Sequence, residues 1–345
     1  MLISEIQRYY NDRSVLVTGG LGFIGSNLVI ALAQAGARVM VVDSSVAGCG
    51  ANPFNLYPVC SDVDVYPFDI GDQEVEGPLR EADIIFNLAG EVSHIHSMLF
   101  PERDLRINTL SQLRFLQACR HAAPRRRIVY ASTRQVYGAP QYLPVDEDHP
   151  VVPVDFNGVH ECAAAHYHQL LTRLSLIDAI VLRFTNVYGP RMAIQLPCQG
   201  VLSVFLRQAV RGEPITLYGD GTQFRDPIHV SDACDALLRA GAITNPESRT
   251  LNVGGRAPVT LLEIANELRA QRSLPSTEFL PFPAERAKID IGNYCSDSSA
   301  CEGVLQWQPV MDLCKGLRET MQYYDEHATR YLQTGHPCSC PLSHS

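Results

Sequence analysis

The chain has 345 residues, of which 46% are hydrophobic and 19% are charged, and its formal net charge at pH 7 is -9. This length suffices for two domains or one large α/β unit, and the acidic balance argues against nucleic acid or an anionic membrane surface as main partner, because both would repel it. The sequence shows no apolar run of about 18 residues and no signal-peptide pattern, so we expect a cytoplasmic protein that does not cross a membrane.

Apolar runs typical of buried strands alternate with helical patterns through the first half of the chain. Helical stretches lie between most of these runs, notably at residues 103–122. Strands that are apolar throughout are typical of a parallel sheet that helices cover on both faces. The pattern therefore predicts an α/β protein with a doubly wound parallel sheet, the Rossmann fold. The runs cover residues 14–20, 37–43, 63–69, 82–90, 126–132 and 179–189.

Beyond residue 189 the strand pattern gives way to irregular segments with short helices, around residues 200–212 and 260–271. This change predicts a second, smaller C-terminal α/β domain for the substrate. We assign residues 1–189 and 228–253 to the sheet domain, residues 190–227 and 254–330 to the substrate domain, and residues 331–345 to a flexible tail.

The 11 cysteines are scattered, odd in number and without paired metal-ligand spacing. They are typical of unpaired thiols in a reducing compartment. The tail holds His336, Cys338 and Cys340, which could together bind a metal, but a frayed chain end is the favoured interpretation. We therefore predict no metal site.

The segment "TGGLGFIG", residues 18–25, indicates a dinucleotide site. It contains Gly20, Gly22 and Gly25 in dinucleotide-binding spacing, and Gly19 adds a second set with intervals of three. Glycines are needed there because the chain must turn tightly and bring its N–H groups to a pyrophosphate at a helix N-terminus. Asp43, about 20 residues on at the end of the second strand, would accept hydrogen bonds from ribose hydroxyls and repel a 2′-phosphate. The cofactor predicted is therefore NAD.

Further segments follow in the order and approximate spacing of a known family. They are "FDI" (68–70), "NLAG" (87–90), Asn108, "STRQVYG" (132–138), "LRFTNVYGPR" (182–191), "GDGTQFRDPIHVSDA" (219–233) and "LNVGG" (251–255). With the glycine segment, they make the chain resemble the extended short-chain dehydrogenase/reductase family, the nucleotide-sugar epimerases and dehydratases, over nearly its whole length. The resemblance implies that Asp69 and Ile70 lie by the adenine, Leu88 and Ala89 by the ribose and pyrophosphate, and Phe184 beside the nicotinamide. It adds Phe23, Ile24 and Asn108 to the cofactor site.

The resemblance also implies a nucleotide-diphosphate sugar as partner, held between the two domains. It places Asn186, Arg225 and Arg286 at the diphosphate, with Arg191 and Gln199 as weaker candidates. Guanidinium groups and a carboxamide suit phosphate oxygens, although each arginine could instead be a solvated surface charge. Relatives commonly dimerise through the helices that here span about 103–122 and 157–176, so a homodimer is expected.

The segment "VDFNGVHECAAAHYH", residues 154–168, lacks the catalytic pair of that family. There a Tyr phenolate takes the proton of a sugar hydroxyl, and a Lys four residues later lowers the Tyr pKa from ~10. Asn157 and Glu161 stand at these two positions. The only lysines, Lys288 and Lys315, are not preceded by Tyr four residues earlier, so no shift of register restores the pair. A carboxylate at position 161 would raise, not lower, the pKa of a neighbouring phenol.

Four residues are candidates for the catalytic roles that remain. Thr133 matches the family hydroxyl that hydrogen-bonds the reacting sugar oxygen, and Glu161 can accept from both nicotinamide-ribose hydroxyls. His160 is the nearest residue suited to proton transfer, because a free imidazole titrates near ~6.5. Alternatively, His160 and His168 are solvated or helix-packing residues, and Asn157 shapes the start of the helix.

Two further stretches of the sequence bear on which reaction the protein catalyses. His94 and His96, after "NLAG", are reserve candidates for proton transfer, because the family's loop approaches the sugar there. If the segment is extended, the two side chains point to opposite sides, which disfavours a joint metal site. Arg134 and Gln135 stand where sugar 4,6-dehydratases carry acidic residues, which disfavours elimination of water. We therefore predict an NAD-dependent nucleotide-sugar epimerase that acts through a transient keto-sugar. The alternatives are a catalytically silent protein that binds NAD and a nucleotide sugar, or a dehydratase or decarboxylase with relocated acid-base groups.

Overall fold

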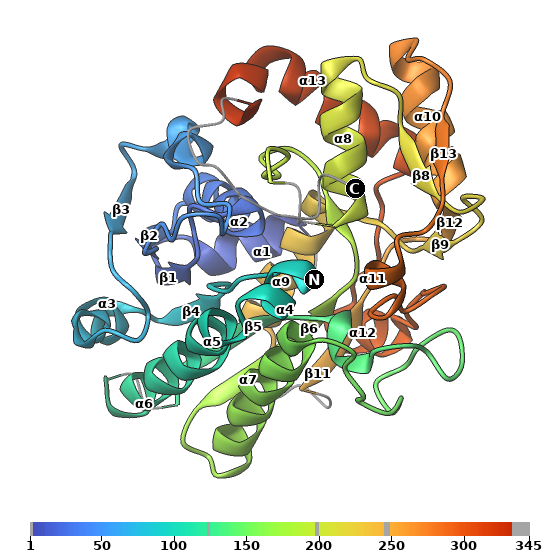
Figure 1. Cartoon of the computed structure of the whole chain (residues 1–345). Helices are drawn as coiled ribbons and strands as arrows, with labels where there is room; N and C mark the ends of the chain where they lie inside the picture. Colours follow the sequence, from blue (N-terminus) through green and yellow to red (C-terminus); the bar gives the residue numbers. More distant parts are fainter. Residues whose placement is uncertain (1–2, 123–124, 197–199, 245–248, 333–345) are drawn as a thin grey trace.

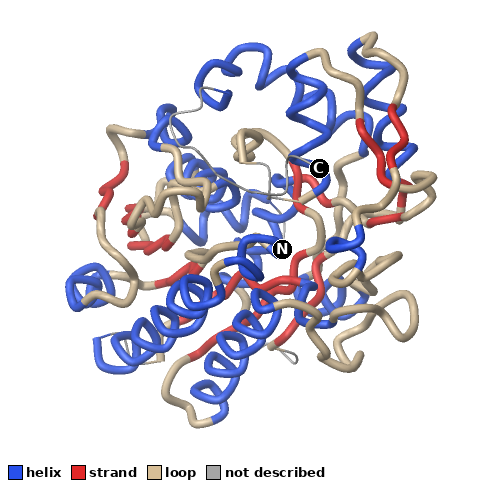
Figure 2. The backbone as a smooth tube through the Cα atoms, viewed as in Figure 1, coloured by secondary structure: helices blue, strands red, loops and turns tan. Residues whose placement is uncertain are grey.

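The computed structural model describes residues 3–122, 125–196, 200–244 and 249–332. Its centre is a seven-stranded sheet in the order β11-β6-β5-β4-β1-β2-β3, in which all neighbouring strands are parallel. Figure 2 shows these strands between the helices. The order and the crossovers confirm the predicted doubly wound sheet. The strands are β1 (Ser14–Thr18), β2 (Arg38–Val42), β3 (Val63–Tyr66), β4 (Ile84–Asn87), β5 (Arg127–Thr133), β6 (Asp178–Phe184) and β11 (Thr250–Val253).

Helices cover both faces of this sheet because its strands are apolar on both sides. On one face Leu28 of α2 and Leu237 of α9 share a core with the sheet residue Val17. On the other face Phe115 of α6 packs in a second core with Ile85 of β4. Figure 1 shows α5, α6 and α7 side by side on this second face. The helices are α1 (Ile3–Tyr10), α2 (Phe23–Gln34), α9 (Val230–Ala242), α3 (Glu76–Glu81), α6 (Gln112–Ala122) and α7 (Phe156–Arg173).

The predicted helix at 103–122 consists of three consecutive segments. These are α5 (Pro101–Leu105), the π-helical turn η3 (Arg106–Ser111) and α6. Such single π-helical turns inside helices are frequent at functional sites. The second helix expected to lie beside it, predicted at 157–176, is α7 and ends at Arg173.

A third core lies beyond the sheet, where Figure 1 shows α8, α10 and α13 together. Here the predicted helices at 200–212 and 260–271 are α8 (Val201–Arg211) and α10 (Leu261–Arg272), and α13 (Leu313–Leu332) packs against both. Three two-stranded sheets accompany them: β7 (Val187–Tyr188) with β10 (Ile228–His229), β9 (Phe224–Arg225) with β12 (Val259–Thr260), and β8 (Thr216–Tyr218) with β13 (Glu278–Leu280). The short elements are η1 (Pro53–Val59), η2 (Gln73–Val75), α4 (His94–Leu99), η4 (Arg134–Tyr137), α11 (Ala284–Ala287) and α12 (Ser299–Leu305).

Two segments bear on the predicted boundaries. Cys301 and Leu305 of α12 pack into the core of the central sheet, although the sequence assigns them to the substrate domain. Helix α13 continues to Leu332 and buries Tyr331, so the helix includes the first two residues of the expected tail. Residues 333–345 lie outside the described residues, and the division into two domains stays a prediction. Within the described part of the chain, no helix is long and apolar enough to cross a bilayer.

Candidate active site

The glycine-rich turn joins β1 to α2 and leaves almost no room for side chains. Gly19 has a positive φ of 69°, and a Cβ atom on it would lie 2.7 Å from the Leu88 carbonyl oxygen. A Cβ atom on Gly25 would lie 2.2 Å from the Gly19 carbonyl oxygen. Gly22 is the N-cap of α2, and both Gly22 and Phe23 line a cavity. The first turn of α2, with its unpaired N–H groups, therefore begins at the cavity wall, as a bound pyrophosphate requires.

Asp43 stands at the end of β2 beside the glycine turn. Its carboxylate accepts hydrogen bonds from the Leu21 and Ser45 backbone N–H groups at 3.0 and 2.8 Å. Burial raises the pKa of Asp43, against the opposing effect of these two hydrogen bonds. Asp43 lines a cavity of about 600 Å³. The predicted cofactor residues Gly19, Gly22, Asp69, Ile70, Leu88 and Ala89 line the same cavity.

A second cavity, of about 1320 Å³, continues from the first, since Gly19, Gly22 and Leu88 line both. It is also lined by the predicted cofactor residues Phe23, Ile24, Gly25 and Phe184. The two cavities therefore bring together eleven of the twelve predicted cofactor residues along one groove, and their shape and polar groups fit a dinucleotide. Asn108 of η3 does not line either cavity. Instead, its amide exchanges two hydrogen bonds of 2.8 Å with the backbone of Glu91 and so holds the loop after β4.

Thr133 lies in the second cavity at the carboxyl end of β5. Its register partner on β6 is Phe184, the residue expected beside the nicotinamide. The Thr133 hydroxyl accepts a hydrogen bond from the backbone N–H of Gln135 at 3.2 Å, because Thr133 is also the N-cap of η4. Sheet pairing thus places the predicted sugar-hydroxyl ligand next to the predicted coenzyme neighbour.

Asn157 occupies the Tyr position of the family and is fully buried. Its side-chain amide donates to the Glu91 carbonyl oxygen at 2.6 Å and to Asp104 Oδ2 at 3.0 Å. Both N–H groups of Asn157 are therefore engaged in holding α7 against the loop after β4 and against α5. A carboxamide does not exchange protons near neutral pH, so this wall of the cavity lacks an acid-base group at the family's position.

Glu161 lines the cavity and accepts a hydrogen bond from the Tyr130 hydroxyl at 2.7 Å. Burial, and to a lesser degree the nearby Asp104, raises the pKa of Glu161 to about 7, against the effect of that hydrogen bond. Burial first and Glu161 second raise the pKa of Tyr130 well above its ordinary value, as expected for a phenol beside a carboxylate. The ring of His168 stacks on Tyr130 at 4.2 Å, and burial lowers the pKa of His168 to about 4. His168 is a packing residue.

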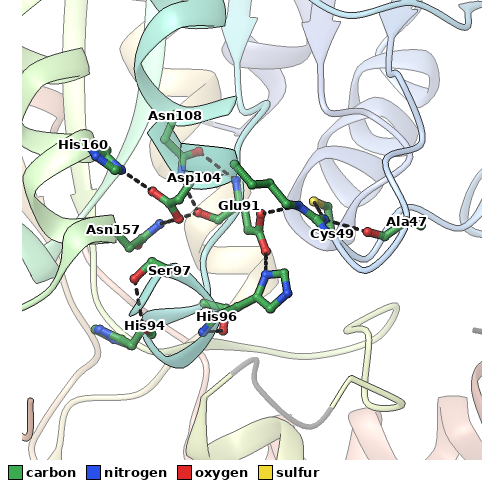
Figure 3. A network of polar contacts seen from close by, with 12 residues as sticks. Ala47, Cys49, Glu91, His94, His96, Ser97, Asp104, Asn108, Asn157 and His160 are labelled. Atoms are coloured by element: carbon green, nitrogen blue, oxygen red, sulfur yellow. Dashed lines mark hydrogen bonds and ion pairs between the residues drawn. The ribbon is translucent and has the colours of Figure 1, made fainter. Parts of the chain in front are cut away.

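His160 faces away from the groove. Its Nδ1 atom lies 2.6 Å from Asp104 Oδ1, and Figure 3 shows the two side chains pointing toward one another. Neither residue is among those that line the two cavities. The same aspartate also accepts from Asn157, so it joins two residues of α7 to α5. This geometry favours the helix-packing interpretation of His160, whereas a role in proton transfer stays a prediction without support from its position.

His94 does line the second cavity. Its Nδ1 atom pairs with Asp155, the N-cap of α7, and its Nε2 atom lies 2.5 Å from Gln135 Nε2. His96 pairs instead with Glu91. Both histidines belong to the short helix α4, which Ser93 caps, so the extended geometry considered for this segment does not apply, and Figure 3 shows their side chains leaving the helix in different directions. The described residues contain no cluster of three His, Cys, Asp or Glu side chains arranged for a metal ion.

The predicted diphosphate ligands are dispersed. Asn186 lines the cavity, and its buried Oδ1 atom has no hydrogen-bond partner. Arg225 is buried but donates to two backbone carbonyls at 2.8 and 2.6 Å. Arg191 donates to a side-chain oxygen at 3.0 Å and a backbone oxygen at 3.2 Å, and Arg286 lies over an aromatic ring at 5.3 Å. None of these three arginines lines the cavities, and Gln199 lies outside the described residues.

Two buried groups that sequence reasoning did not find hold residues that line the groove. The Thr18 hydroxyl accepts hydrogen bonds from the N–H groups of Leu88 and Ala89, both at 3.2 Å, and donates to the Asn87 side chain at 2.8 Å. It thereby fixes the loop after β4, whose residue Leu88 lines both cavities. Tyr130 is the partner of Glu161 described above. Both lie on strands of the predicted sheet, but a strand pattern does not show which polar residue bonds which neighbour.

The parallel sheet, the glycine turn at the start of α2 and the groove that follows define a dinucleotide-binding protein of the Rossmann class. Residues 15–254 match the model of the NAD dependent epimerase/dehydratase family. The chain belongs to this family, which confirms the resemblance that the motifs indicate.

Individual relatives match over most of their length. The UDP-glucose 4-epimerase of Mycolicibacterium smegmatis is 30% identical over 315 residues, which cover 90% of this chain and 97% of that protein. The structure of UDP-glucose 4-epimerase from Thermotoga maritima with UDP-glucose superposes with a TM-score of 0.82 at 26% identity and covers 91% of this chain and 99% of that chain. UDP-glucuronic acid 4-epimerase from Bacillus cereus, in complex with UDP-glucuronic acid and NAD, gives a TM-score of 0.79 at 25% identity, with the same coverage.

Proposed function

We propose that the protein is an NAD-dependent epimerase of nucleotide-diphosphate sugars. The observation that carries this proposal is the continuity of the two cavities, with the glycine turn on one side and Thr133 beside Phe184 on the other. A coenzyme that enters along the turn reaches the position where Thr133 meets a sugar hydroxyl. Relatives that carry names of UDP-sugar 4-epimerases support the same substrate class.

The residues of the groove have separate roles in this proposal. The turn from Gly19 to Gly25 holds the coenzyme pyrophosphate, and Asp43 binds the adenosine ribose hydroxyls and repels a 2′-phosphate. Glu161 accepts from the nicotinamide-ribose hydroxyls, and Asn186 contributes to the substrate diphosphate. When bound, NAD takes up a hydride from a ring carbon and returns it. Thr133 orients the oxygen on that carbon throughout.

The purified protein provides the test. We expect it to retain NAD through purification and to interconvert at least one pair of epimers among UDP-glucose, UDP-galactose, UDP-N-acetylglucosamine and UDP-glucuronic acid. Products are resolved by chromatography, and mass spectrometry detects loss of water or carbon dioxide, which would indicate a dehydratase or decarboxylase instead. Binding of NAD and UDP-sugars without any conversion would overturn the proposal in favour of a silent binding protein, the function that the loss of the Tyr and Lys favours.

We further propose that the protein is a homodimer through α5, η3, α6 and α7. Large apolar side chains are exposed along this face of the molecule, which is the layer of helices seen side by side in Figure 1. Light scattering after size exclusion should give a dimer, and Val159→Asp should give a monomer, because it places a charge in the apolar face. A monomeric wild type would overturn this part of the proposal. The exposed residues are Leu99, Phe100, Leu105, Leu110, Phe156, Val159 and Leu170.

We also propose a cytoplasmic location. The eight described cysteines are all free thiols, as suits a reducing compartment, and the deeply buried Cys119, Cys234 and Cys301 are packed in the cores of the sheet. Fractionation of cells with an antibody against the protein tests this location. Recovery of the protein in a non-cytoplasmic fraction would contradict it.

A further inference from the structure

We propose that His94, held by Asp155, is the group that exchanges the proton of the sugar hydroxyl. This inference rests on the proposed function and names the residue that replaces the missing Tyr. The reaction needs a side chain that titrates near neutral pH and reaches the substrate. Asn157 does not titrate there, His160 faces Asp104, and His94 is the one histidine among the residues that line the described cavities.

The imidazole of His94 is fixed by the starts of two helices. His94 is the first residue of α4, and its carbonyl oxygen accepts a hydrogen bond from the Ser97 hydroxyl at 2.8 Å. Asp155 is the N-cap of α7; one carboxylate oxygen accepts from the Gly158 N–H at 2.7 Å, and the other faces His94 Nδ1. The Asp155 side chain is 1% exposed, whereas that of His94 is 29% exposed. The pair is therefore held at its buried carboxylate, while the partly exposed imidazole lines the cavity with its Nε2 atom beside the Gln135 amide.

Asp155 is suited to stabilise a positive charge on His94. Burial by itself would raise the pKa of Asp155, but the hydrogen bond and the charge of His94, together with the Gly158 N–H and Arg134, lower it overall. Asp155 is thus an anion at neutral pH. With its carboxylate against Nδ1, the imidazole presents Nε2 to the cavity, unprotonated in the neutral form and protonated in the cation. The charged groups close to the pair are Asp155 itself at the start of α7 and Arg134 of η4.

Gln135 accommodates both protonation states. Its amide lies 2.5 Å from His94 Nε2, and its own Oε1 atom is buried without a partner. The amide N–H donates to a neutral Nε2, and half a turn of the amide presents Oε1 to a protonated Nε2. The backbone N–H of the same residue donates to Thr133, so η4 joins the imidazole to the hydroxyl that orients the sugar. Proton exchange at His94 therefore takes place beside the reacting oxygen.

The step balances without a further reactant. The sugar O–H bond breaks and an Nε2–H bond forms on His94, while bound NAD would accept the hydride from the same ring carbon. After the keto-sugar has turned its other face to the coenzyme, the reduced coenzyme would return that hydride, and Nε2 gives the proton back to the oxygen. Asp155 keeps its charge throughout, and Thr133 donates or accepts a hydrogen bond without losing its proton.

The test compares His94→Gln with two other substitutions. His160→Gln is the competing variant, and His166→Gln, on an exposed part of the same helix α7, is the matched control. We expect a loss in kcat of at least about 100-fold for His94→Gln, with partial recovery when imidazole is added, and changes below about threefold for His166→Gln. His94→Gln should keep the NAD content, the unfolding temperature and the Kd for the converted UDP-sugar near the wild-type values. These three measurements separate an effect on catalysis from an effect on binding or folding.

Three outcomes would overturn the inference, and one would overturn the proposed function on which it rests. Activity of His94→Gln within about threefold of wild type, or a large loss confined to His160→Gln, removes His94 from the mechanism while leaving the proposed function intact. A wild type that converts no UDP-sugar removes the proposed function and the inference with it. NMR provides a readout that does not depend on turnover: the His94 ring resonance, identified by its loss in His94→Gln, should move when UDP-glucose is added, and an unmoved resonance with the sugar bound contradicts the inference.

Discussion

Two imidazole–carboxylate pairs lie on either side of the first turn of α7. In each, the Nδ1 atom of a histidine meets a buried aspartate: His94 meets Asp155, and His160 meets Asp104. Both aspartate side chains are 1% exposed, so the chemistry of the two pairs is alike. They differ in what surrounds the other ring nitrogen, because His94 lines the groove and His160 does not. In the mechanism that we propose, access to the groove distinguishes His94 from His160, because a carboxylate partner is common to both.

The largest effect that we expect is on the pair outside the groove. Asp104→Ala leaves the donors of both His160 and Asn157 without a partner in a buried place. The free energy of unfolding should fall by about 3 kcal/mol, the usual range for a broken buried pair. Urea unfolding followed by circular dichroism measures it. A loss below about 1 kcal/mol would mean that Asp104 does not hold α7 to α5.

Glu161 follows His160 on α7, and no cation is among the described groups that shift its pKa. Burial raises its pKa from 4.5 to about 7. The stability that this group contributes is therefore complete below about pH 4.5 and is lost as the pH rises through about 7, by at most about 3 kcal/mol. The wild type should lose correspondingly more unfolding free energy than Glu161→Gln between about pH 5 and pH 8. Parallel pH profiles of the two proteins would contradict the raised pKa.

Asp155→Asn tests the pair inside the groove. Asparagine caps a helix as well as aspartate does, so the unfolding free energy should change by less than about 1 kcal/mol. The kcat should fall by about 10- to 100-fold, because a neutral amide does not stabilise the imidazolium form of His94. Steady-state kinetics and urea unfolding of the same variant measure these two changes. Equal kcat in both proteins would show that the carboxylate only caps α7.

Gln135→Ala should have the smallest effect. It removes the amide from Nε2 of His94 but leaves the carboxylate pair and the backbone hydrogen bond to Thr133 in place. We expect a change in kcat of about threefold, roughly the value of one net hydrogen bond. Steady-state kinetics measure it, with the exposed His166→Gln as control. A loss as large as that of His94→Gln would show that the Gln135 amide is needed to position the imidazole and does more than occupy the end of the ring.

The sequence predicts the coenzyme side of the groove far better than the opposite side. Gly19, Gly22 and Asp43 are identified because a turn, a helix start and a strand end each have strict local requirements, and these follow one another along the chain. The positions of His94 and Asp155 depend on contacts between segments about 60 residues apart, which no local pattern encodes. Even so, Asp155 directly before a helical pattern is a recognisable N-cap signal.

The arginines and α7 also show that a local sequence pattern does not determine where a side chain points. Arg225 and Arg286 are predicted at the diphosphate from the resemblance, but Arg225 donates to two backbone carbonyls, Arg286 lies over an aromatic ring, and neither lines the groove. On α7, the helix itself follows from the sequence, whereas the directions of His160 and Glu161 depend on how the helix is rotated against the sheet. A weak amphipathic pattern leaves that rotation open.

The pairing of Thr133 with Phe184 in neighbouring strands has a consequence for how such enzymes diverge. If Thr133 and Phe184 have the roles that we propose, the place of hydride transfer is set by two paired strands of the central sheet. The proton, by contrast, is handled by side chains on helices and loops around it. The donor of the proton can therefore be exchanged during evolution, from one helix to another, without disturbing the alignment of coenzyme and sugar.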